Sequence, residues 1–430
     1  MTEQKTLPYH KSKNRFFYGY VVLAAATLIM MVMYGTRAAF GVFFKPMLTE
    51  FGWTRALTSG ALSLSMFMQG CLAVFMGGMN DRVGPRIVLT FCGLLLGIGC
   101  LLMSRINTVW QMYLFYGVII GVGMSGIFVP ILSTVARWFI KRRNMMTGIA
   151  LAGISIGSLI APPAANWMIT TYDWRVAYIL IGCIILLIGV LTAQFLKRDP
   201  GQIGQMPYGA VERERQDLNT GDEGLSLRDA IATWQFWMLF SIFISLGFCF
   251  FSIMVHIVPH VTDLGISTKS AANILAAMSG SVIIGNIVMG GIADRIGSKQ
   301  VCIIGLILTA IAVFWLVSIK EVWMFYAFVF IFGVAHGGCV GAESPLVAWL
   351  FGMSSHGLLL GIISFGFTIG ASIGPLFTGY IFDSTGSYKL AFITYGAISL
   401  LGLIMATLIR PIKENVKWQE AGRSSSETAR

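Results

Sequence analysis

Two charged side chains lie inside long apolar stretches of the sequence, and they are Arg37 and Glu343. A charge at the centre of a bilayer costs at least about 2.5–3.5 kcal/mol on insertion scales, so an ionisable residue there is a candidate for function. Arg37 stays protonated and offers a planar fork that suits a carboxylate. Glu343 could carry a proton, because a carboxyl group can load and release one as access to the two sides alternates.

Both residues also have a structural interpretation. Arg37 could pair with a helix carbonyl or an acid, or extend part of the way to the outer water. Glu343 could form an ion pair that closes an inner gate, or it could face a wet vestibule. Substrate contact by Arg37 and proton carriage by Glu343 are therefore hypotheses that compete with these roles.

Uncharged polar residues in the same stretches extend the candidate site. Histidine titrates near neutral pH, so His260 and His336 are candidates for proton coupling, and His256 is a candidate for substrate contact. The alternative for each is a hydrogen-bonded packing residue. Gln69 and Tyr116 could form hydrogen bonds in a central cavity.

The composition places these residues in a membrane protein. Of the 430 residues, 56% are hydrophobic and 11% are charged, whereas soluble domains carry about 25% charged residues. A run of ~20 apolar residues spans the hydrocarbon core. We therefore predict an all-α membrane protein with twelve transmembrane helices. Their expected ranges are 17–45, 56–79, 87–104, 109–138, 145–171, 175–196, 235–262, 270–293, 301–319, 322–350, 358–382 and 389–410.

A long polar segment at 197–234 divides the chain into two six-helix halves, at 17–196 and 235–410, with tails at 1–16 and 411–430. We expect this linker to end in a short helix near 226–231. Of the 30 lysines and arginines, 22 fall on the side of the tails. The positive-inside rule then places both termini in the cytoplasm, in a plasma (inner) membrane protein. Anionic inner-leaflet lipid would favour this arrangement, so the net charge of +11 does not indicate nucleic-acid binding.

An internal repeat relates the two halves. Residues 77–86 recur as 290–299 at an offset of 213, and the same offset aligns 49–54 with 262–267 and 153–157 with 366–370. Because an even number of spans separates equivalent helices, the repeats are parallel. We expect a pseudo-twofold axis along the membrane normal, with Asp81 and Asp294 at the cytoplasmic ends of their helices.

The repeated segment resembles the signature of the major facilitator superfamily between its second and third helices, Gly-x-Leu-x-Asp-Arg-x-Gly-x-Arg/Lys. Met79 and Ile292 replace the leucine. The resemblance implies alternating access between the halves and a gating role for both loops. It implies that Asp81, with Arg82 and Arg86, latches the first loop to helix eleven. The second loop carries the corresponding Asp294 and Arg295.

Shorter segments resemble the monocarboxylate transporters and the bacterial oxalate/formate antiporter family. They are 18–22, 40–44, 136–139, 198–207 and 256–259. Members of these families commonly have a carboxylate-binding arginine in helix eight, at the position of Asn286 in this chain. Asn286 could instead serve as a polar ligand for a second carboxylate.

Together, these residues favour a secondary transporter for a small organic anion, in particular a monocarboxylate, moved with a proton or in exchange for another anion. Arg37 would face a central cavity between the halves, within reach of polar residues on helices four, seven or eight, and would hold the carboxylate there. Efflux of an apolar or amphipathic compound is the alternative within transport, and a non-transporting sensor of the same fold also stays open. We expect no enzyme activity, because the spans contain no paired carboxylates, histidine cluster or nucleophile elbow. We also expect no metal site, since the seven cysteines lack metal-ligand spacing. We further expect that the protein needs no cofactor and is a monomer.

Overall fold

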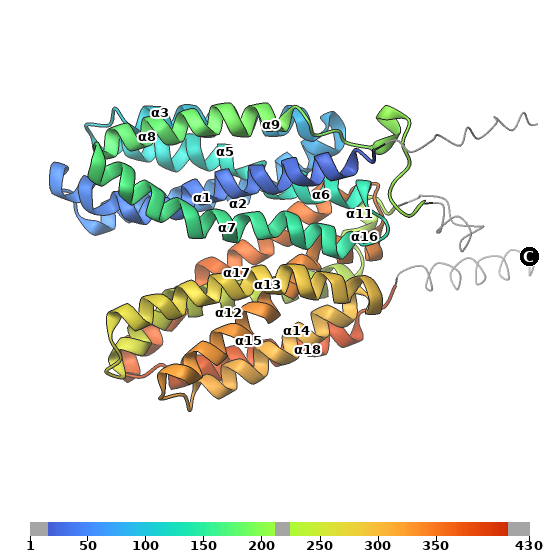
Figure 1. Cartoon of the computed structure of the whole chain (residues 1–430). Coiled ribbons are helices and arrows are strands. Elements are labelled where there is room, and N and C mark those ends of the chain that lie inside the picture. Colours follow the sequence, from blue (N-terminus) through green and yellow to red (C-terminus); the bar gives the residue numbers. More distant parts are fainter. Residues whose placement is uncertain (1–15, 211–223, 412–430) are drawn as a thin grey trace, which may run out of the picture.

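The computed structural model describes residues 16–210 and 224–411. This part of the chain contains twelve helices that are long and apolar enough to cross a membrane. The all-α prediction is therefore confirmed. Two bundles lie side by side, and the chain enters the second only after completing the first (Figure 1).

The first bundle holds six spans, two of which consist of several helical segments. The segments are α1 (Gly19–Phe51), α2 (Arg55–Val83), α3 (Pro85–Met103), α4 (Val109–Met112), η1 (Tyr113–Ile120), α5 (Gly121–Ser125), α6 (Phe128–Trp138), α7 (Arg143–Thr171), α8 (Trp174–Ile184), η2 (Ile185–Val190) and α9 (Leu191–Ala193). Helix four comprises α4 to α6, and helix six comprises α8 to α9.

The second bundle repeats this order after a linker with a short turn, η3 (Pro200–Ile203), and a short helix, α11 (Leu227–Ile231). The helix predicted near 226–231 is thus present, with Ser226 as its N-cap. The six spans that follow are α12 (Trp234–Asp263), α13 (Thr268–Ile296), α14 (Ser298–Leu316), α15 (Val322–Gly341) with α16 (Glu343–Phe351), α17 (His356–Thr385) and α18 (Lys389–Leu408).

Helices four and ten, predicted as continuous spans, are each interrupted. Helix four breaks after α5, at Gly126, and helix ten breaks at Ala342. A proline lacks the N–H that would bond to the carbonyl four residues earlier. Pro130 stands four residues after Gly126, and Pro345 stands four residues after Gly341. The breaks therefore have the same cause in the two halves.

Helix one is longer than predicted, because it continues through Pro46 to Phe51. The proline leaves only the carbonyl of Val42 without its usual helical partner. The helix instead ends at Gly52, whose φ of 66° forms a left-handed cap that donates to the Leu48 carbonyl. The predicted end at residue 45 was wrong for this reason.

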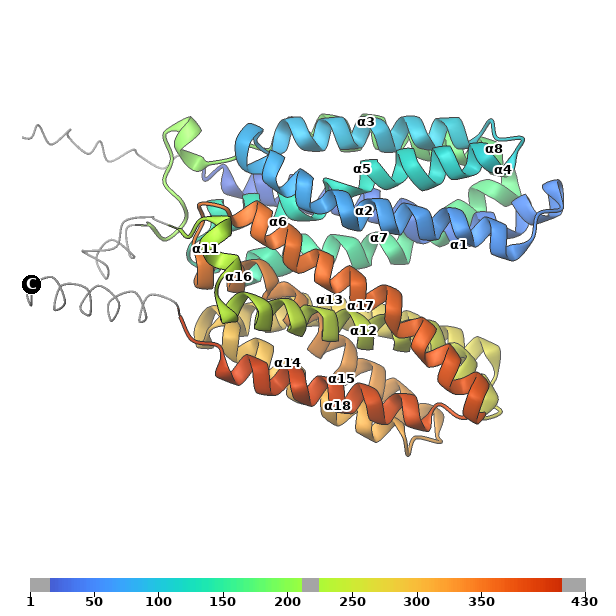
Figure 2. The same ribbon diagram turned by 180° about the vertical axis from the view of Figure 1, so that it is seen from behind.

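Most of the contact between the halves is made by two helix pairs, α2 with α17 and α7 with α13, and α6 adds contacts with α16 and α17. They lie close together where the linker crosses between them and diverge toward the opposite end (Figures 1 and 2). We name these two ends of the molecule the linker end and the far end. The first and last described residues both lie at the linker end.

The linker contacts equivalent positions in the two halves. Tyr208 N–H donates to the Trp138 carbonyl at 2.9 Å, and Leu225 N–H donates to the Phe351 carbonyl at 2.8 Å. Trp138 and Phe351 end helices four and ten and are related by the repeat offset of 213. The linker is therefore fixed to both bundles at its two described ends.

Candidate functional site

Arg37 lies on α1 and is partly buried. Its guanidinium donates a hydrogen bond to the side-chain oxygen of Gln69 on α2. The Gln69 amide nitrogen donates in turn to the Tyr34 hydroxyl at 3.3 Å. Tyr34 precedes Arg37 by three residues, so both side chains are on the same face of α1. Gln69 thus connects them.

The helix that supplies the partner differs from the expected one. We expected Arg37 to reach polar residues on helices four, seven or eight, but its hydrogen bond goes to helix two. Tyr116 of helix four is buried. Its ring packs on Phe40, with centroids 4.2 Å apart. A contact of Arg37 with helix four, seven or eight therefore stays a prediction.

Glu343 is the first residue of α16, immediately after the break in helix ten. Its side chain is buried, with 2% exposure. Ser364 of α17 donates its hydroxyl hydrogen bond to Glu343 Oε1 at 2.7 Å. Within the described chain the carboxylate forms no ion pair. In this conformation Glu343 therefore does not form an ion pair that closes an inner gate, and it does not face a wet vestibule.

Arg37 and Glu343 belong to hydrogen-bonded groups on opposite halves of the protein. Gln69 of the first group lies on α2, Ser364 of the second lies on α17, and these two helices pack together. A side chain added at Gly70, next to Gln69, would meet Thr368 and Phe365 of α17. The contact of Gly70 with α17 therefore places the segment that holds Gln69 beside the segment that holds Ser364.

Two of the three candidate histidines, His336 and His260, pack against aromatic rings. His336 is buried and stacks on Phe250, with ring centroids 3.7 Å apart. His260 packs edge-on against Phe392 at 4.9 Å, and its Nε2 has no hydrogen-bond partner in the described chain. The structure gives them packing contacts and does not join them to Arg37.

His256 has a different kind of contact. Its Nε2 lies 3.0 Å from the carbonyl oxygen of Pro375 on α17. This contact ties α12 to the proline-containing part of α17 within one half. A substrate contact by His256 thus stays a prediction.

Asn286 is buried where α13 crosses α7 and α15. Side chains added at Gly148, Gly337 or Gly341 would meet the Asn286 backbone or approach its side-chain oxygen. That oxygen has no hydrogen-bond partner in the described chain. Asn286 therefore lies beside the break that precedes Glu343, and the structure does not join it to Arg37.

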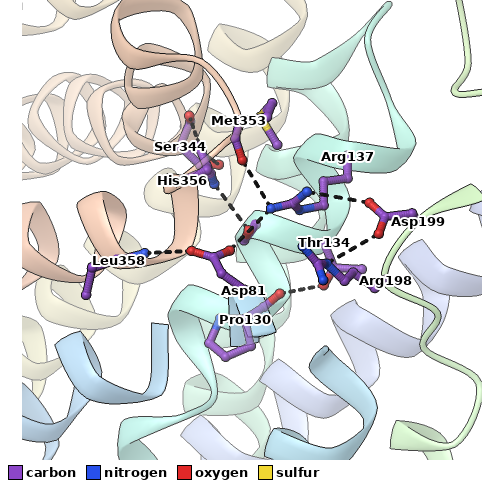
Figure 3. Close-up of polar contacts among 11 residues, drawn as sticks. Asp81, Pro130, Thr134, Arg137, Arg198, Asp199, Ser344, Met353, His356 and Leu358 are labelled. Carbon is purple, nitrogen blue, oxygen red and sulfur yellow. Dashed lines mark hydrogen bonds and ion pairs between the residues drawn. The ribbon is translucent and has the colours of Figure 1, made fainter. Parts of the chain in front are cut away.

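The first signature loop reaches the other half through Asp81 (Figure 3). Asp81 Oδ2 accepts a hydrogen bond from the Leu358 N–H, in the first turn of α17, at 3.1 Å. The predicted contact with helix eleven is thus present. Asp81 Oδ1 also lies 3.2 Å from Arg137 Nη2, and the same nitrogen donates to the Met353 carbonyl at 3.2 Å. Arg137 therefore joins both halves.

The second loop makes the corresponding contact in the opposite direction. Asp294 accepts hydrogen bonds from the Asn144 N–H at 2.8 Å and the Met145 N–H at 3.0 Å, at the start of α7. The Asn144 side chain also donates to Asp294 at 3.0 Å. Ser298 donates to the Asn144 side-chain oxygen at 2.7 Å. Asp81 and Asp294 both contact the segment around helices four and five, so they share the linker end, as predicted.

The predicted latch of Arg82 and Arg86 to helix eleven is not formed in this conformation, and a gating role of Arg295 stays a prediction. Arg86 donates through Nε to Gln194 at 2.7 Å, within its own half. Arg82 and Arg295 form no ion pair or hydrogen bond in the described chain. Arg86 starts α3, so its side chain reaches the adjacent end of helix six instead of crossing to the other half. Arg137, which the sequence interpretation passed over, supplies the cation beside Asp81.

His356 is a second residue that the sequence interpretation missed. It is fully buried. Its Nδ1 lies 3.2 Å from Ser133 Oγ of the first half, and its Nε2 lies 3.1 Å from the Ser344 carbonyl of the second. In the internal repeat its counterpart is Arg143. Two titratable residues of different type at equivalent positions were the sign in the sequence that this position lies at the interface between the halves.

The hydrogen bonds between the halves gather at the linker end. They involve Asp81, Arg137, Asn144, Asp294 and His356. The halves diverge toward the far end (Figure 2). This is the arrangement of a two-bundle protein closed on one side. Glu343 directly precedes Ser344, whose hydroxyl donates to the Leu132 carbonyl of the first half at 3.4 Å.

No group of three or more potential metal ligands occurs among the described residues. The candidate site therefore consists of one cation, one carboxyl group and several hydrogen-bonding side chains. Such a set can bind a small anion and carry a proton.

A family model described as Major Facilitator Superfamily matches residues 26–285 and 257–429. Monocarboxylate transporter 11 of Homo sapiens is 27% identical over 404 residues, which cover 90% of this chain and 81% of that protein. Monocarboxylate transporter 13 of Rattus norvegicus is 25% identical over 389 residues, with coverages of 90% and 87%. The agnestins efflux protein AgnL12 of Paecilomyces divaricatus is 25% identical over 395 residues, with coverages of 91% and 87%.

Among solved structures, the fold is similar to that of the proton:xylose symporter XylE bound to 6-bromo-6-deoxy-D-glucose. The TM-score is 0.74 at 14% identity, over 92% of this chain and 96% of that one. The architecture of two six-helix bundles is therefore shared with a solved transporter of the same superfamily.

Proposed function

Because this chain belongs to the major facilitator superfamily of membrane transporters, we propose that its substrate is a small organic anion, in particular a monocarboxylate. The substrate would bind between the two bundles, and alternating access would carry it across. The similarity to monocarboxylate transporters 11 and 13 supports this substrate class. The chemistry of the site supports it independently.

The observation that carries the proposal is the uncompensated charge of Arg37. Its hydrogen-bond partner is the neutral amide of Gln69, and it forms no ion pair with a carboxylate in the described chain. A guanidinium in an apolar span without a counter-ion is costly. An anionic substrate would supply the missing negative charge, and its carboxylate could accept two parallel hydrogen bonds.

The test is counterflow of short-chain monocarboxylates in proteoliposomes. We expect wild-type protein to exchange a labelled monocarboxylate and to ignore the matching neutral amide. Arg37→Lys should weaken binding, because a point charge does not replace a bidentate fork. Arg37→Ala should abolish uptake while the protein stays folded. Lys45→Ala removes an exposed cation from the same helix and serves as the matched control.

Normal monocarboxylate transport by Arg37→Ala would remove the main support for this proposal. The efflux of an amphipathic compound would then become the leading function. That second candidate is favoured by the similarity to AgnL12, which has nearly the same identity and coverage as the monocarboxylate transporters. Absence of counterflow for every anion and amphipathic compound tested would instead support a sensor.

We further propose that Glu343 couples transport to protons, unless the protein exchanges one anion for another. Glu343 is buried beside the substrate region and has one hydroxyl donor but no cationic partner in the described chain. A proton on this group would neutralise it during the return of the carrier. His336 and His260 are the alternative proton carriers, although their contacts are with aromatic rings.

For the membrane orientation, we propose that the linker end faces the cytoplasm of a multi-pass plasma (inner) membrane protein. The lysines and arginines gathered at this end support the assignment. The conformation described here would then be open to the outside and closed toward the cytoplasm. A monomer is sufficient for this mechanism, because one chain supplies both of the bundles that would form the site.

A further inference from the structure

A cavity of about 320 Å³ lies at the linker end of the first half, away from the substrate region. It is formed where the loop between α2 and α3 meets the end of helix six. Arg86, Lys197 and Arg198 contribute side chains to its wall. None of the residues that line it is acidic.

The charges around this cavity are only partly compensated. Arg198 Nε lies 3.3 Å from Asp199 Oδ2, and Asp199 Oδ1 lies 3.5 Å from Arg137 Nη1. Arg86 uses its Nε for the neutral Gln194 side chain. Lys197 lies 5.0 Å from the centre of the Tyr18 ring. Neither Arg86 nor Lys197 forms an ion pair in the described chain, so two positive charges remain available to an anion.

The backbone of the wall adds to this potential. Gly84 precedes α3 and caps it without a side-chain hydrogen bond. The 19-residue helix α3 therefore directs the positive end of its dipole, and N–H groups of its first turn, toward the same region. This contribution strengthens the basic wall and does not define the site by itself.

The rim of the cavity is apolar and exposed. Ile87 is 57% exposed and Val83 is 47% exposed. Along the neighbouring helices, Phe91 and Phe195 are 46% and 53% exposed. Val83, Ile87 and Phe91 belong to membrane-spanning helices and Phe195 follows the end of helix six, so acyl chains that lie along these elements would contact them. A ligand that fits both parts has an anionic head and an apolar tail.

We propose that this cavity binds the phosphate group of an anionic phospholipid headgroup in the leaflet at the linker end. The headgroup lies against Arg86 and Lys197, and the acyl chains follow the exposed faces of α3 and helix six. Arg86 belongs to the first signature loop, so the bound lipid rests against the loop that also carries Asp81.

The test measures the thermal unfolding midpoint of the purified full chain in neutral detergent. Phosphatidylglycerol and phosphatidylcholine with identical acyl chains are titrated separately, and inorganic phosphate is titrated alone. We expect phosphatidylglycerol to raise the midpoint and the other two to have little effect. An equal response to inorganic phosphate would overturn the lipid assignment in favour of a free anion. An equal response to phosphatidylcholine would overturn the role of the charge.

The variant Arg86→Gln with Lys197→Gln should raise the half-saturating mole fraction of phosphatidylglycerol about 25-fold. This follows from roughly 1 kcal/mol, or ~5-fold, for each basic side chain near an anionic surface. The control is Lys299→Gln with Arg410→Gln, at the equivalent positions of the second half, with the same change in net charge. An equal loss in the control would show attraction to net charge only and overturn the site. If the double variant fails to fold, Lys197→Gln alone gives the same comparison against Arg410→Gln.

Discussion

Asp81 and Asp294 each accept hydrogen bonds from the first turn of a helix in the opposite half. Asp81 binds the Leu358 N–H of α17, and Asp294 binds the Met145 N–H of α7. Both pairs are related by the repeat offset of 213. A carboxylate at a helix N-terminus satisfies free N–H groups and complements the helix dipole. The two contacts therefore close the linker end by the same physical means, in opposite directions.

Neutralising Asp81 should slow transport with little change in substrate affinity. Asp81→Asn keeps the side-chain shape but removes the charge beside Arg137 and weakens the cap on α17. Hydrogen bonds to charged groups contribute about 1.5–3 kcal/mol, so the closed linker end should become ~10- to 100-fold less favoured relative to the open one. Counterflow gives the turnover rate, and labelling of a cysteine introduced at the linker end reports the opening.

The same change at Asp294 should have a smaller effect. Asp294 forms no ion pair in the part of the chain that the structure describes, and its contacts come from neutral groups of Asn144 and Met145. Asp173→Asn, an N-cap at the start of α8 outside both signature loops, is the control for general loss of a cap. Unchanged turnover in Asp81→Asn would mean that the contact with α17 does not limit the transport cycle.

A methyl group at Gly77 should act on the same interface through packing. A side chain added there would meet the Gly357 carbonyl of α17. Overpacking costs typically 1–3 kcal/mol, so Gly77→Ala should favour the open linker end and lower turnover. Gly291→Ala in the second copy is the matched control, since nothing lies near its added side chain. Equal turnover of the two variants would show that the close approach of α2 and α17 is not needed.

The internal repeat explains why so much of the fold could be predicted. One register of 213 residues fixed the number of helices, the two halves and the equivalence of Asp81 with Asp294. The breaks in helices four and ten were missed because a proline has no N–H, a local effect that apolar periodicity does not register. The signs were Gly126 with Pro130 and Gly341 with Pro345.

The candidate site was predicted only in part. Arg37 and Glu343 stand out because charge is rare in apolar spans. Tyr34 and Ser364 are residue types that do not stand out in an apolar span. Only helix packing joins Tyr34 to Arg37 through Gln69, and Ser364 to Glu343. Arg137 was assigned to membrane topology because it lies near other basic residues. Its contact with Asp81 depends on the crossing of helices that are distant in sequence, which composition does not encode.

The neutral partner of Arg37 leads to a specific test of anion binding. Gln69→Glu would place a carboxylate beside the guanidinium and supply the negative charge that the substrate should bring. We expect this variant to lose monocarboxylate binding almost completely. Gln69→Leu removes the amide without adding charge, so the substrate affinity should fall by only ~10-fold, from the loss of positioning hydrogen bonds. Equilibrium binding of a labelled monocarboxylate distinguishes the two. Equal affinities would indicate that the charge of Arg37 is not used for the substrate.

Glu343 decides between proton symport and anion exchange. Glu343→Gln retains a polar group that can accept from Ser364 but cannot carry a proton. If Glu343 is the proton carrier, the variant should fail to accumulate substrate on a pH gradient. It should still exchange labelled for unlabelled substrate, because exchange does not require the empty carrier to return. Both assays use the same proteoliposomes, so the exchange rate controls for folding and insertion.

Two other outcomes of this experiment have a definite meaning. Continued accumulation by Glu343→Gln would exclude Glu343 as the proton carrier, and His336→Ala and His260→Ala would then be the next variants to measure. If the wild type exchanges substrate but does not respond to a pH gradient, the protein is an antiporter. In that case the hydrogen bond from Ser364 to Glu343 fixes α17 against the broken helix ten, and Glu343→Gln should leave the exchange rate nearly unchanged.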